Sequence, residues 1–242
     1  MIYIIFSDVH SNLEALQTFL EIADGIVHDK KVCLGDLVGY GADPNPCIEL
    51  VRDRADLVLG GNHDYAVTGR MDLSRFNAYA YQACLWTRDR LTRENREFLE
   101  SLPARREEEG VCWAHSSPFE PEQWHYIFSV ADGARQFDHF KAPLCFVGHT
   151  HVPMILEKTP DGEIAAHPIA DLKLVPRSRY IVNVGSLGQP RDGNPDPAFV
   201  IFDDDSMIVE YRRFTYDYAT TQNKIVGNGL PGYLADRLSV GR

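Results

Sequence analysis

The sequence predicts a mixed α/β fold in which β-sheets are flanked by helices. In the first half of the chain, apolar runs rich in β-branched residues alternate with segments of helical spacing. The second half consists mostly of apolar runs of strand length, separated by Gly, Pro and Asp turns. A length of 242 residues, 44% of them hydrophobic, allows these elements to enclose a sizeable core. We find no repeat or long linker and expect one domain over residues 1–242.

Apolar patterning defines the elements of the first half. Runs of β-branched and aromatic residues predict buried strands, and leucines three and four positions apart predict a helix that Asn12 can cap. A run of charged residues is expected at the solvated end of the last helix of this half. In order, we predict a strand Met1–Phe6, a helix from the Asn12 cap to about Ala23, strands ending at Asp36 and Asn62, two helices within Asn77–Leu102 that break near Leu91–Thr92, the solvated run Arg105–Glu109, and a strand ending at His115.

The second half is predicted to be mainly strand. The stretch PLCFVGHTHVP, from Pro143 to Pro153, has the composition of a buried strand that stops at Gly148. A helix is expected from about Asp217 to Gly227, where the glycine favours a helix end. Between them we predict five strands, Met154–Lys158, Glu163–Ile169, Tyr180–Val184, Ala198–Asp203 and Met207–Phe214.

The charge balance and the cysteines limit the class of protein. A net charge of −11 argues against nonspecific binding to DNA or RNA, which needs clustered Lys and Arg, but it allows a small phosphate-bearing substrate beside a local cation. The five cysteines include no C-x-x-C pair, and Cys33, Cys112 and Cys145 lie in apolar runs, as expected in the reducing cytoplasm. The sequence has neither a signal-peptide pattern nor a membrane-spanning run, so we expect no membrane association. It indicates no particular oligomeric state.

Five of the predicted strands end in residues that bind metals or transfer protons. In sheets with helical crossovers, ligands gather outside the carboxyl ends of the strands, so these side chains converge on one crevice if the runs share a sheet and a direction. Each ending alone also fits a turn residue or a surface histidine, whereas its repetition in five runs favours a site. The terminal residues are Asp8 with His10, Asp36, Asn62 with His63, His115, and His149 with His151.

The residue types at these ends suit a pair of divalent transition-metal ions. Imidazole and carboxylate bind Mn, Fe, Zn or Ni, with Mn favoured here, and the absence of a thiolate among them argues against a structural zinc site. Two divalent cations carry four positive charges, and Asp8 and Asp36 return two negative ones. The remaining positive charge favours the binding of a phosphate group. Paired metals also lower the pKa of a water, which becomes a nucleophile at neutral pH.

In order and spacing, these residues resemble the signature of the calcineurin-like metallophosphoesterase superfamily, in the blocks SDVHSN, LGDLVGYG, GGNHDY, WAHS and GHTH between Ser7 and His151. The resemblance implies two packed mixed β-sheets flanked by helices, a four-layer sandwich. It also implies two sets of metal ligands that share Asp36 as a bridge, one of Asp8, His10, Asp36 and His151, the other of Asp36, Asn62, His115 and His149.

The GGNHDY block contributes two further residues by this resemblance. His63 is implied to be no ligand but the acid that protonates the leaving oxygen or stabilises the transition state. Asp64 beside it is expected to orient the His63 imidazole. Both are therefore candidate catalytic residues.

At two places the sequence differs from particular branches of the superfamily. The protein phosphatase and diadenosine tetraphosphatase branches have Asp-Arg-Gly where this chain has Gly-Tyr-Gly at residues 39–41, and Gly where it has Ser11. The arginine that clamps substrate phosphate is therefore missing there. The segment NVGSLGQPRDG, Asn183–Gly193, resembles instead the small bacterial and archaeal phosphodiesterase branch, and its arginine is either a phosphate contact or a surface residue on a β-turn. The substrate contacts that we expect are Asn12, Tyr40 and Arg191.

The remaining polar candidates are weaker. Ser116 lies next to His115, but adjacency in sequence does not create the geometry of a serine nucleophile. Specificity is expected in the loops Tyr65–Phe76 and Pro118–Ser129, which the pattern does not position. Four histidines without a motif are expected at the surface: His28, His125, His139 and His167.

The sequence therefore predicts a dinuclear metal-dependent phosphoric ester hydrolase, acting as a phosphodiesterase in which a metal-bound hydroxide attacks a small phosphate ester directly. Alternatives within the superfamily are a phosphomonoesterase, a dinucleoside polyphosphate hydrolase and a protein phosphatase. A different class is a metal-bearing scaffold subunit without turnover. The intact His63 argues against a scaffold, which has no need of a proton donor.

Overall fold

Two six-stranded mixed β-sheets form the centre of the structure, a computed structural model that describes residues 1–242. The predicted α/β class is confirmed. Sheet A has the order β3-β2-β1-β11-β12-β9 and contains β1 (Ile2–Phe6), β2 (Lys30–Cys33), β3 (Leu57–Val58), β9 (Leu172–Lys173), β11 (Ala198–Asp203) and β12 (Ile208–Arg213). Sheet B has the order β4-β5-β6-β10-β7-β8 and contains β4 (Arg105–Glu108), β5 (Val111–Ala114), β6 (Leu144–Val147), β7 (Met154–Lys158), β8 (Ile164–His167) and β10 (Arg179–Asn183).

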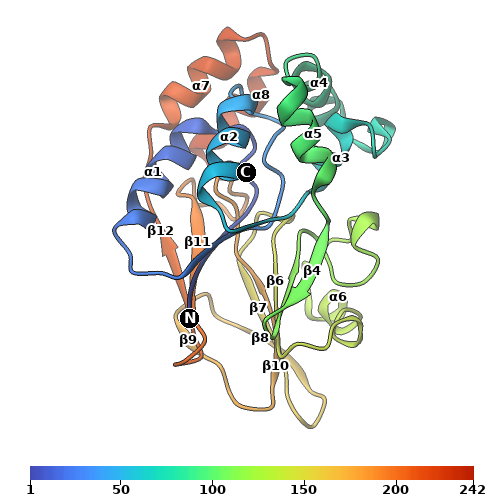
Figure 1. The fold of residues 1–242 in the computed structure, drawn as a ribbon, viewed down its shortest axis with the longest axis vertical. Helices are drawn as coiled ribbons and strands as arrows, with labels where there is room; N and C mark the ends of the chain where they lie inside the picture. The colour runs from blue at the N-terminus through green and yellow to red at the C-terminus, as the bar shows by residue number, and fades with distance from the viewer.

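The strands that precede the predicted site residues are parallel within each sheet. β1 is parallel to β2 and β2 to β3, whereas β5 is parallel to β6 in the other sheet. The five runs therefore belong to two sheets rather than to one. Their end residues still meet, because the packed sheets bring the carboxyl ends of both parallel sets together. β1 starts at the N-terminus and rises toward the end of the molecule where most helices gather (Figure 1).

Both faces of each sheet are covered, which explains why the strands are continuously apolar. Ile4 of β1 belongs to a core on the helix side of sheet A with Leu16. Its neighbour Tyr3 packs between the sheets against Trp113, with ring centroids 5.6 Å apart. Cys112, next to Trp113, belongs to a third core on the outer face of sheet B. This alternation produces four layers, as the resemblance implied.

Eight helices cover the sheets, and most begin at a capping side chain. The predicted cap is confirmed, because the Asn12 side chain accepts a hydrogen bond from the Ala15 N–H. Thr92 caps the second of the two helices predicted within 77–102, and Asp217 caps the last predicted helix. The helices are α1 (Leu13–Asp24), α2 (Pro44–Arg54), α3 (Asn62–Thr68), α4 (Ala78–Arg88), α5 (Arg93–Ser101), α6 (Val130–Ala134), α7 (Tyr218–Gly227) and α8 (Gly232–Asp236).

The first half differs from the prediction at the charged run Arg105–Glu109 and at helices α2 and α3, neither of which was predicted. The charged run Arg105–Glu109, expected to be a solvated helix end, contributes the edge strand β4, which pairs antiparallel with β5. Arg105 Nη2 lies 2.7 Å from Glu107 Oε2, and such charges are frequent on edge strands because they discourage pairing with other sheets. Helix α2 was not predicted, because the sequence DPNP resembles a turn. Pro44 occupies its first turn, where a missing N–H is tolerated.

The cysteines and the helices bear on two further expectations. All five cysteines are free and buried, which agrees with their interpretation as small apolar residues of the core. None of the helices combines the length and the apolar character that a membrane crossing requires.

Candidate metal centre

The residues that follow the parallel strands turn sharply. Asp8 and His10 after β1, Asp36 after β2, and His149 and His151 after β6 all have φ between 49° and 66°. This left-handed region is rare for residues with a Cβ and costs roughly 1–3 kcal/mol per residue. Strain of this kind persists only where the surrounding structure enforces it, and its concentration at these strand ends indicates a functional site.

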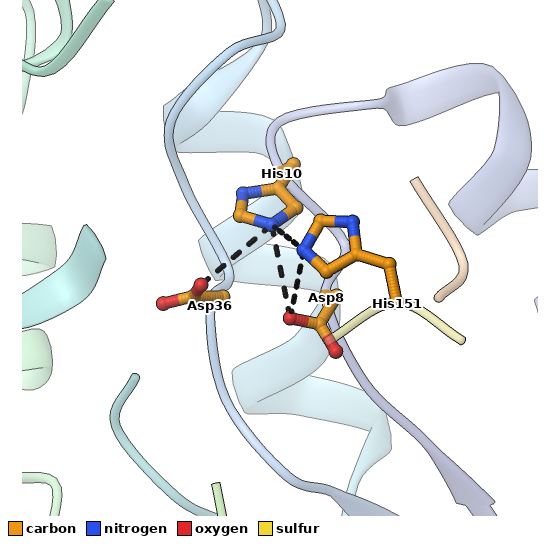
Figure 2. A group of neighbouring side chains, drawn as sticks. All are labelled: Asp8, His10, Asp36 and His151. Atoms are coloured by element: carbon orange, nitrogen blue, oxygen red, sulfur yellow. Dashed lines mark hydrogen bonds and ion pairs between the residues drawn. The ribbon is translucent and has the colours of Figure 1, made fainter. Parts of the chain in front are cut away.

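Four buried side chains form the first cluster, and they come from both sheets (Figure 2). Asp8, His10 and Asp36 follow strands of sheet A, whereas His151 follows a strand of sheet B. The Nε2 atoms of His10 and His151 are 3.0 Å apart, and His151 Nε2 is 3.2 Å from Asp8 Oδ1. One ligand atom from each residue lies within 4.8 Å of the others.

The histidine tautomers of this cluster leave nitrogen lone pairs facing its centre. His10 Nδ1 lies 3.0 Å from the Val38 carbonyl oxygen and His151 Nδ1 lies 2.5 Å from that of Gln189, so each Nδ1–H donates to a carbonyl. Each Nε2 then carries a lone pair, and two lone pairs 3.0 Å apart repel one another. Asp8 Oδ1 is also buried without a hydrogen-bond partner. A cation relieves both defects, so these residues fit a divalent metal ion.

A second cluster shares Asp36 with the first. Asp36 Oδ2 lies 3.4 Å from His115 Nε2 and 3.6 Å from His10 Nε2, so one carboxylate oxygen faces both clusters. His115 Nε2 is also 3.3 Å from Asn62 Oδ1. His115 Nδ1 donates to the Leu34 carbonyl at 3.0 Å, which again directs the Nε2 lone pair inward.

His149 completes the second cluster but is held differently. Its Nε2 donates to the carbonyl oxygen of Trp124 at 3.1 Å, which leaves Nδ1 as the nitrogen with a free lone pair. Tyr126 stacks on the same imidazole, with centroids 4.2 Å apart and ring planes 18° apart. The loop 118–129, expected to influence specificity, therefore supports this second cluster.

Burial and neighbouring charge set different protonation states in the two clusters. Burial lowers the pKa of His10, His149 and His151, that of His149 to about 3, so these imidazoles are neutral at pH 7. Burial also opposes a charge on His115, but the carboxylate of Asp36 prevails and raises the pKa of His115 to about 9. Burial opposes ionisation of Asp36 as well, yet the His115 charge holds the pKa of Asp36 well below its usual range.

His63 belongs to neither cluster and lies in the cavity beside them. Its ring is buried and packs against Tyr40, with centroids 4.4 Å apart, and burial lowers its pKa to about 4. Its Nδ1 lies 3.5 Å from Cys84 Sγ on α4. A Cβ at residue 39 would lie 2.3 Å from His63 Nδ1, and φ there is +92°, so only glycine leaves room for this ring.

The expectation that Asp64 orients His63 is wrong. The Asp64 carboxylate accepts hydrogen bonds from the backbone N–H groups of Gly61, Leu37 and Val38, at 2.9–3.2 Å, and none from the His63 ring. Asp64 therefore joins the loops that carry Asp36 and Asn62. The side chain with a polar contact to a His63 ring nitrogen is Cys84, for which the sequence offered no signal.

The expected substrate contact at Asn12 is also wrong, because its amide is fully used inside the protein. Oδ1 accepts from the Ala15 N–H and the Thr221 hydroxyl. Nδ2 donates to the Gly188 carbonyl and to the Tyr216 hydroxyl, and the side chain is buried. Asn12 caps α1 and ties it to the 183–193 segment and to α7.

A cavity of about 390 Å³ opens beside the second cluster and contains the other two expected substrate contacts, Tyr40 and Arg191. Both specificity loops reach it, through Arg75 and Phe76 from one and Tyr126 from the other. The wall formed by Tyr79, Tyr233 and Arg237 could not be predicted from the sequence, because α4 and the C-terminal segment carry no motif.

Arg191 is a cavity residue rather than a surface arginine on a turn. Its guanidinium carbon lies 5.5 Å from the Tyr40 ring centroid, and Nη2 donates to Gln189 Oε1 at 2.8 Å. The Gln189 backbone carbonyl in turn holds His151. One segment therefore both fixes a metal-site imidazole and presents a cation to the cavity.

The weaker candidates lie apart from the clusters. His28, His125, His139 and His167 are all at least partly exposed and belong to neither cluster, as predicted. The Ser116 hydroxyl donates to the Pro121 carbonyl at 3.1 Å rather than to a histidine, which agrees with its exclusion as a nucleophile.

Two packed mixed sheets with a buried carboxylate and imidazole centre at their strand ends define the class of metallophosphoesterases. A family model described as the calcineurin-like phosphoesterase superfamily domain matches residues 1–207. The chain belongs to this superfamily.

Similar proteins occur in bacteria and archaea. A metallophosphoesterase of known structure from Sphaerobacter thermophilus is 41% identical, with complete coverage of both chains and a TM-score of 0.88. An uncharacterised protein from Methanocaldococcus jannaschii is 41% identical over 243 residues, covering 98% of this chain and 97% of its own. A hypothetical protein from Pyrococcus horikoshii shares the fold at 18% identity, with a TM-score of 0.80 and coverage of 100% of this chain and 98% of its own.

Proposed function

We propose that this chain is a dinuclear metal-dependent phosphodiesterase that hydrolyses a small phosphate ester. The observation that carries the proposal is Asp36 Oδ2, which faces the inward Nε2 atoms of His10 and His115 at 3.6 and 3.4 Å. Because this one carboxylate lies between imidazoles of both clusters, Asp36 would serve as a ligand common to two cations.

Each metal is assigned four ligands, of which Asp36 is common to both. Mn²⁺ is the favoured ion, although imidazole, carboxylate and amide oxygen also suit Fe, Zn and Ni. When bound, two such cations neutralise phosphate charge and generate a nucleophile from water. The proposed sets are Asp8, His10, Asp36 and His151 for the first metal, and Asp36, Asn62, His115 and His149 for the second.

His63 is proposed to act on the phosphate itself. Because burial lowers its pKa to about 4, the free imidazole is neutral at pH 7 and donates a hydrogen bond from its N–H rather than transferring a proton outright. This supports transition-state stabilisation as its first role. Protonation of the leaving oxygen requires that the bound phosphate anion raise this pKa.

One observation favours a phosphomonoesterase as a second candidate. A monoester dianion has one more charge than a diester, and Tyr40 occupies the position of the clamping arginine of the phosphatase branches. Arg191 lies over the Tyr40 ring and can replace that cation from another segment. The preference between the two substrate classes therefore depends on whether Arg191 contacts the cleaved phosphate.

The decisive experiment combines metal content with a substrate comparison. We would load the protein with Mn²⁺ and compare kcat/KM for bis(4-nitrophenyl) phosphate and 4-nitrophenyl phosphate. Faster diester cleavage supports the proposal, whereas a monoester preference that disappears in Arg191→Ala identifies a phosphatase. Two equivalents of bound metal with no turnover of any ester would instead identify the scaffold alternative.

A further inference from the structure

Three arginines line the cavity without a carboxylate partner. They are Arg75, Arg191 and Arg237, and no Asp or Glu oxygen lies within 4 Å of any of them, although the chain has 35 acidic residues for 24 basic ones. Several other arginines have such partners, as Arg54 has Asp24 and Arg52 has Glu94. Three positive charges therefore face this cavity without a paired carboxylate.

Two of these arginines, Arg191 and Arg237, line the cavity together with Tyr40. Burial lowers the pKa of Arg237, and the positive charge of Arg191 lowers it further. Both arginines face Tyr40, whose ring lies 5.5 Å from the Arg191 guanidinium carbon. The Nε of Arg191 is buried with no hydrogen-bond partner. Two like charges in a partly buried wall repel, and an anion between them removes this repulsion.

Arg191 links the metal centre to the cavity. Its backbone N–H donates to the His151 carbonyl at 3.2 Å, and its Nη2 donates to Gln189, whose carbonyl holds the His151 ring. Arg237 lines the same cavity from the C-terminal segment. A ligand held by both arginines therefore reaches from beside the metal centre to the C-terminal segment.

Arg237 belongs to a segment that the family model does not include, since the match ends at residue 207. This segment is firmly attached. Lys224 of α7 bridges Glu14 and Asp43, and Leu234 and Leu238 pack with Ala80 and Ala83 of α4. In Figure 1, α7 and α8 lie beside α1 and α4 at the helix-rich end. Arg237 Nε donates to the backbone carbonyl of Arg242, which leaves its two terminal amino groups for a ligand.

We infer that Arg191 and Arg237 bind a second phosphate group of the substrate, so that the substrate is an organic phosphate with a further phosphate beside the ester that is cleaved. The inference rests on the proposed function and adds its substrate class. The planar guanidinium matches phosphate oxygens with two parallel hydrogen bonds, which a pair of lysines cannot reproduce. A cavity of about 390 Å³ falls within the usual range for small organic ligands.

The test uses two substrates that share the leaving group and the cleaved diester. They are thymidine 5′-(4-nitrophenyl phosphate) and its 3′-phosphorylated form. With the Mn²⁺-loaded protein we expect the second to have a kcat/KM at least about tenfold higher, the effect of one charged hydrogen bond. In Arg237→Gln this advantage falls to within about twofold.

Two controls and a binding measurement separate this role from general effects. Arg93→Gln removes the same charge from an exposed helix position, where Arg93 pairs only with Glu97, and leaves both substrates unaffected. Arg237→Lys keeps the charge and retains an intermediate preference. Calorimetric binding of thymidine 3′,5′-bisphosphate to the loaded protein weakens about tenfold or more in Arg237→Gln, and thymidine 5′-phosphate binding does not.

The outcomes are distinguishable. If neither substrate is hydrolysed by protein that holds two metals, the proposed function fails. If both are hydrolysed at equal rates, and Arg237→Gln changes neither the rates nor bisphosphate binding, the inference fails while the function stands.

Discussion

The two side-chain clusters share the Asp36 carboxylate but are built in different ways. The first is held by strand ends and by the backbone carbonyls of Val38 and Gln189, which fix the tautomer of its imidazoles, while burial lowers the pKa of both and keeps them neutral. The second depends on the 118–129 loop, where Trp124 and Tyr126 hold His149. It also contains His115, whose pKa is raised to about 9. The first cluster is thus preorganised for a cation, whereas the second must release a proton and keep a loop in place to bind one.

The largest expected effect comes from the residue that the clusters share. Asp36→Asn removes the charge that faces both, so metal content falls at both positions and turnover falls by more than the roughly 10²- to 10⁴-fold of a lost proton donor. Elemental analysis and kcat measure this directly. The exposed Asp53→Asn serves as the control for a lost carboxylate. Two full equivalents of metal with normal turnover in Asp36→Asn would contradict the shared role.

The next largest effect distinguishes metal binding by the two clusters from the catalytic step. His63→Gln is expected to keep two metals and lose roughly 10²- to 10⁴-fold in kcat, because His63 lies in the cavity but in neither cluster. Metal analysis of the same preparation provides the control. Loss of one metal in His63→Gln would identify His63 as a metal ligand. That result would contradict its assignment as a catalytic residue outside both clusters.

The pH dependence of metal uptake sharpens the contrast. His115 with a pKa of about 9 is protonated at pH 7, so a cation at the second cluster displaces a proton, and its affinity rises about tenfold per pH unit up to about pH 9. The histidines of the first cluster have lowered pKa values and are already neutral, so affinity there is nearly constant above pH 7. An indicator dye in weak buffer at pH 7.5 should report about one proton for the second metal and about none for the first. Equal proton release for both metals would show that the two clusters titrate alike.

The smallest expected effect tests the loop. Tyr126→Ala removes the ring stacked on His149, and the loss of one aromatic contact should weaken the second metal about three- to tenfold while the first is unchanged. Tyr126→Phe retains the ring and should bind both metals as wild type does. Equal weakening at both positions in the alanine variant would mean that the loop supports the whole centre.

Much of this fold and centre could be predicted from the chain itself. The apolar runs located β1, β2, β5 and β6 because their strands are buried on both faces and leave continuous hydrophobic sequence. The capping side chain of Asn12 located the start of α1, and α7 begins directly after Asp217, close to the predicted start. Helix α2 was not predicted because a proline such as Pro44 occurs both in the first turn of a helix and in a β-turn, and the local sequence does not distinguish the two.

The sequence by itself determined which residues end the strands, since an apolar run that stops at Asp, Asn or His needs no distant information to be recognised. Only the tertiary structure decided that these ends come from two sheets, that Asp64 joins loops rather than orienting His63, and that Cys84 touches that imidazole. It also brought Arg191 and Arg237, 46 positions apart along the chain (237 − 191), to the same cavity. Strand endings follow from the local balance of burial and polarity, whereas these contacts depend on packing between segments distant in sequence, which no local pattern encodes.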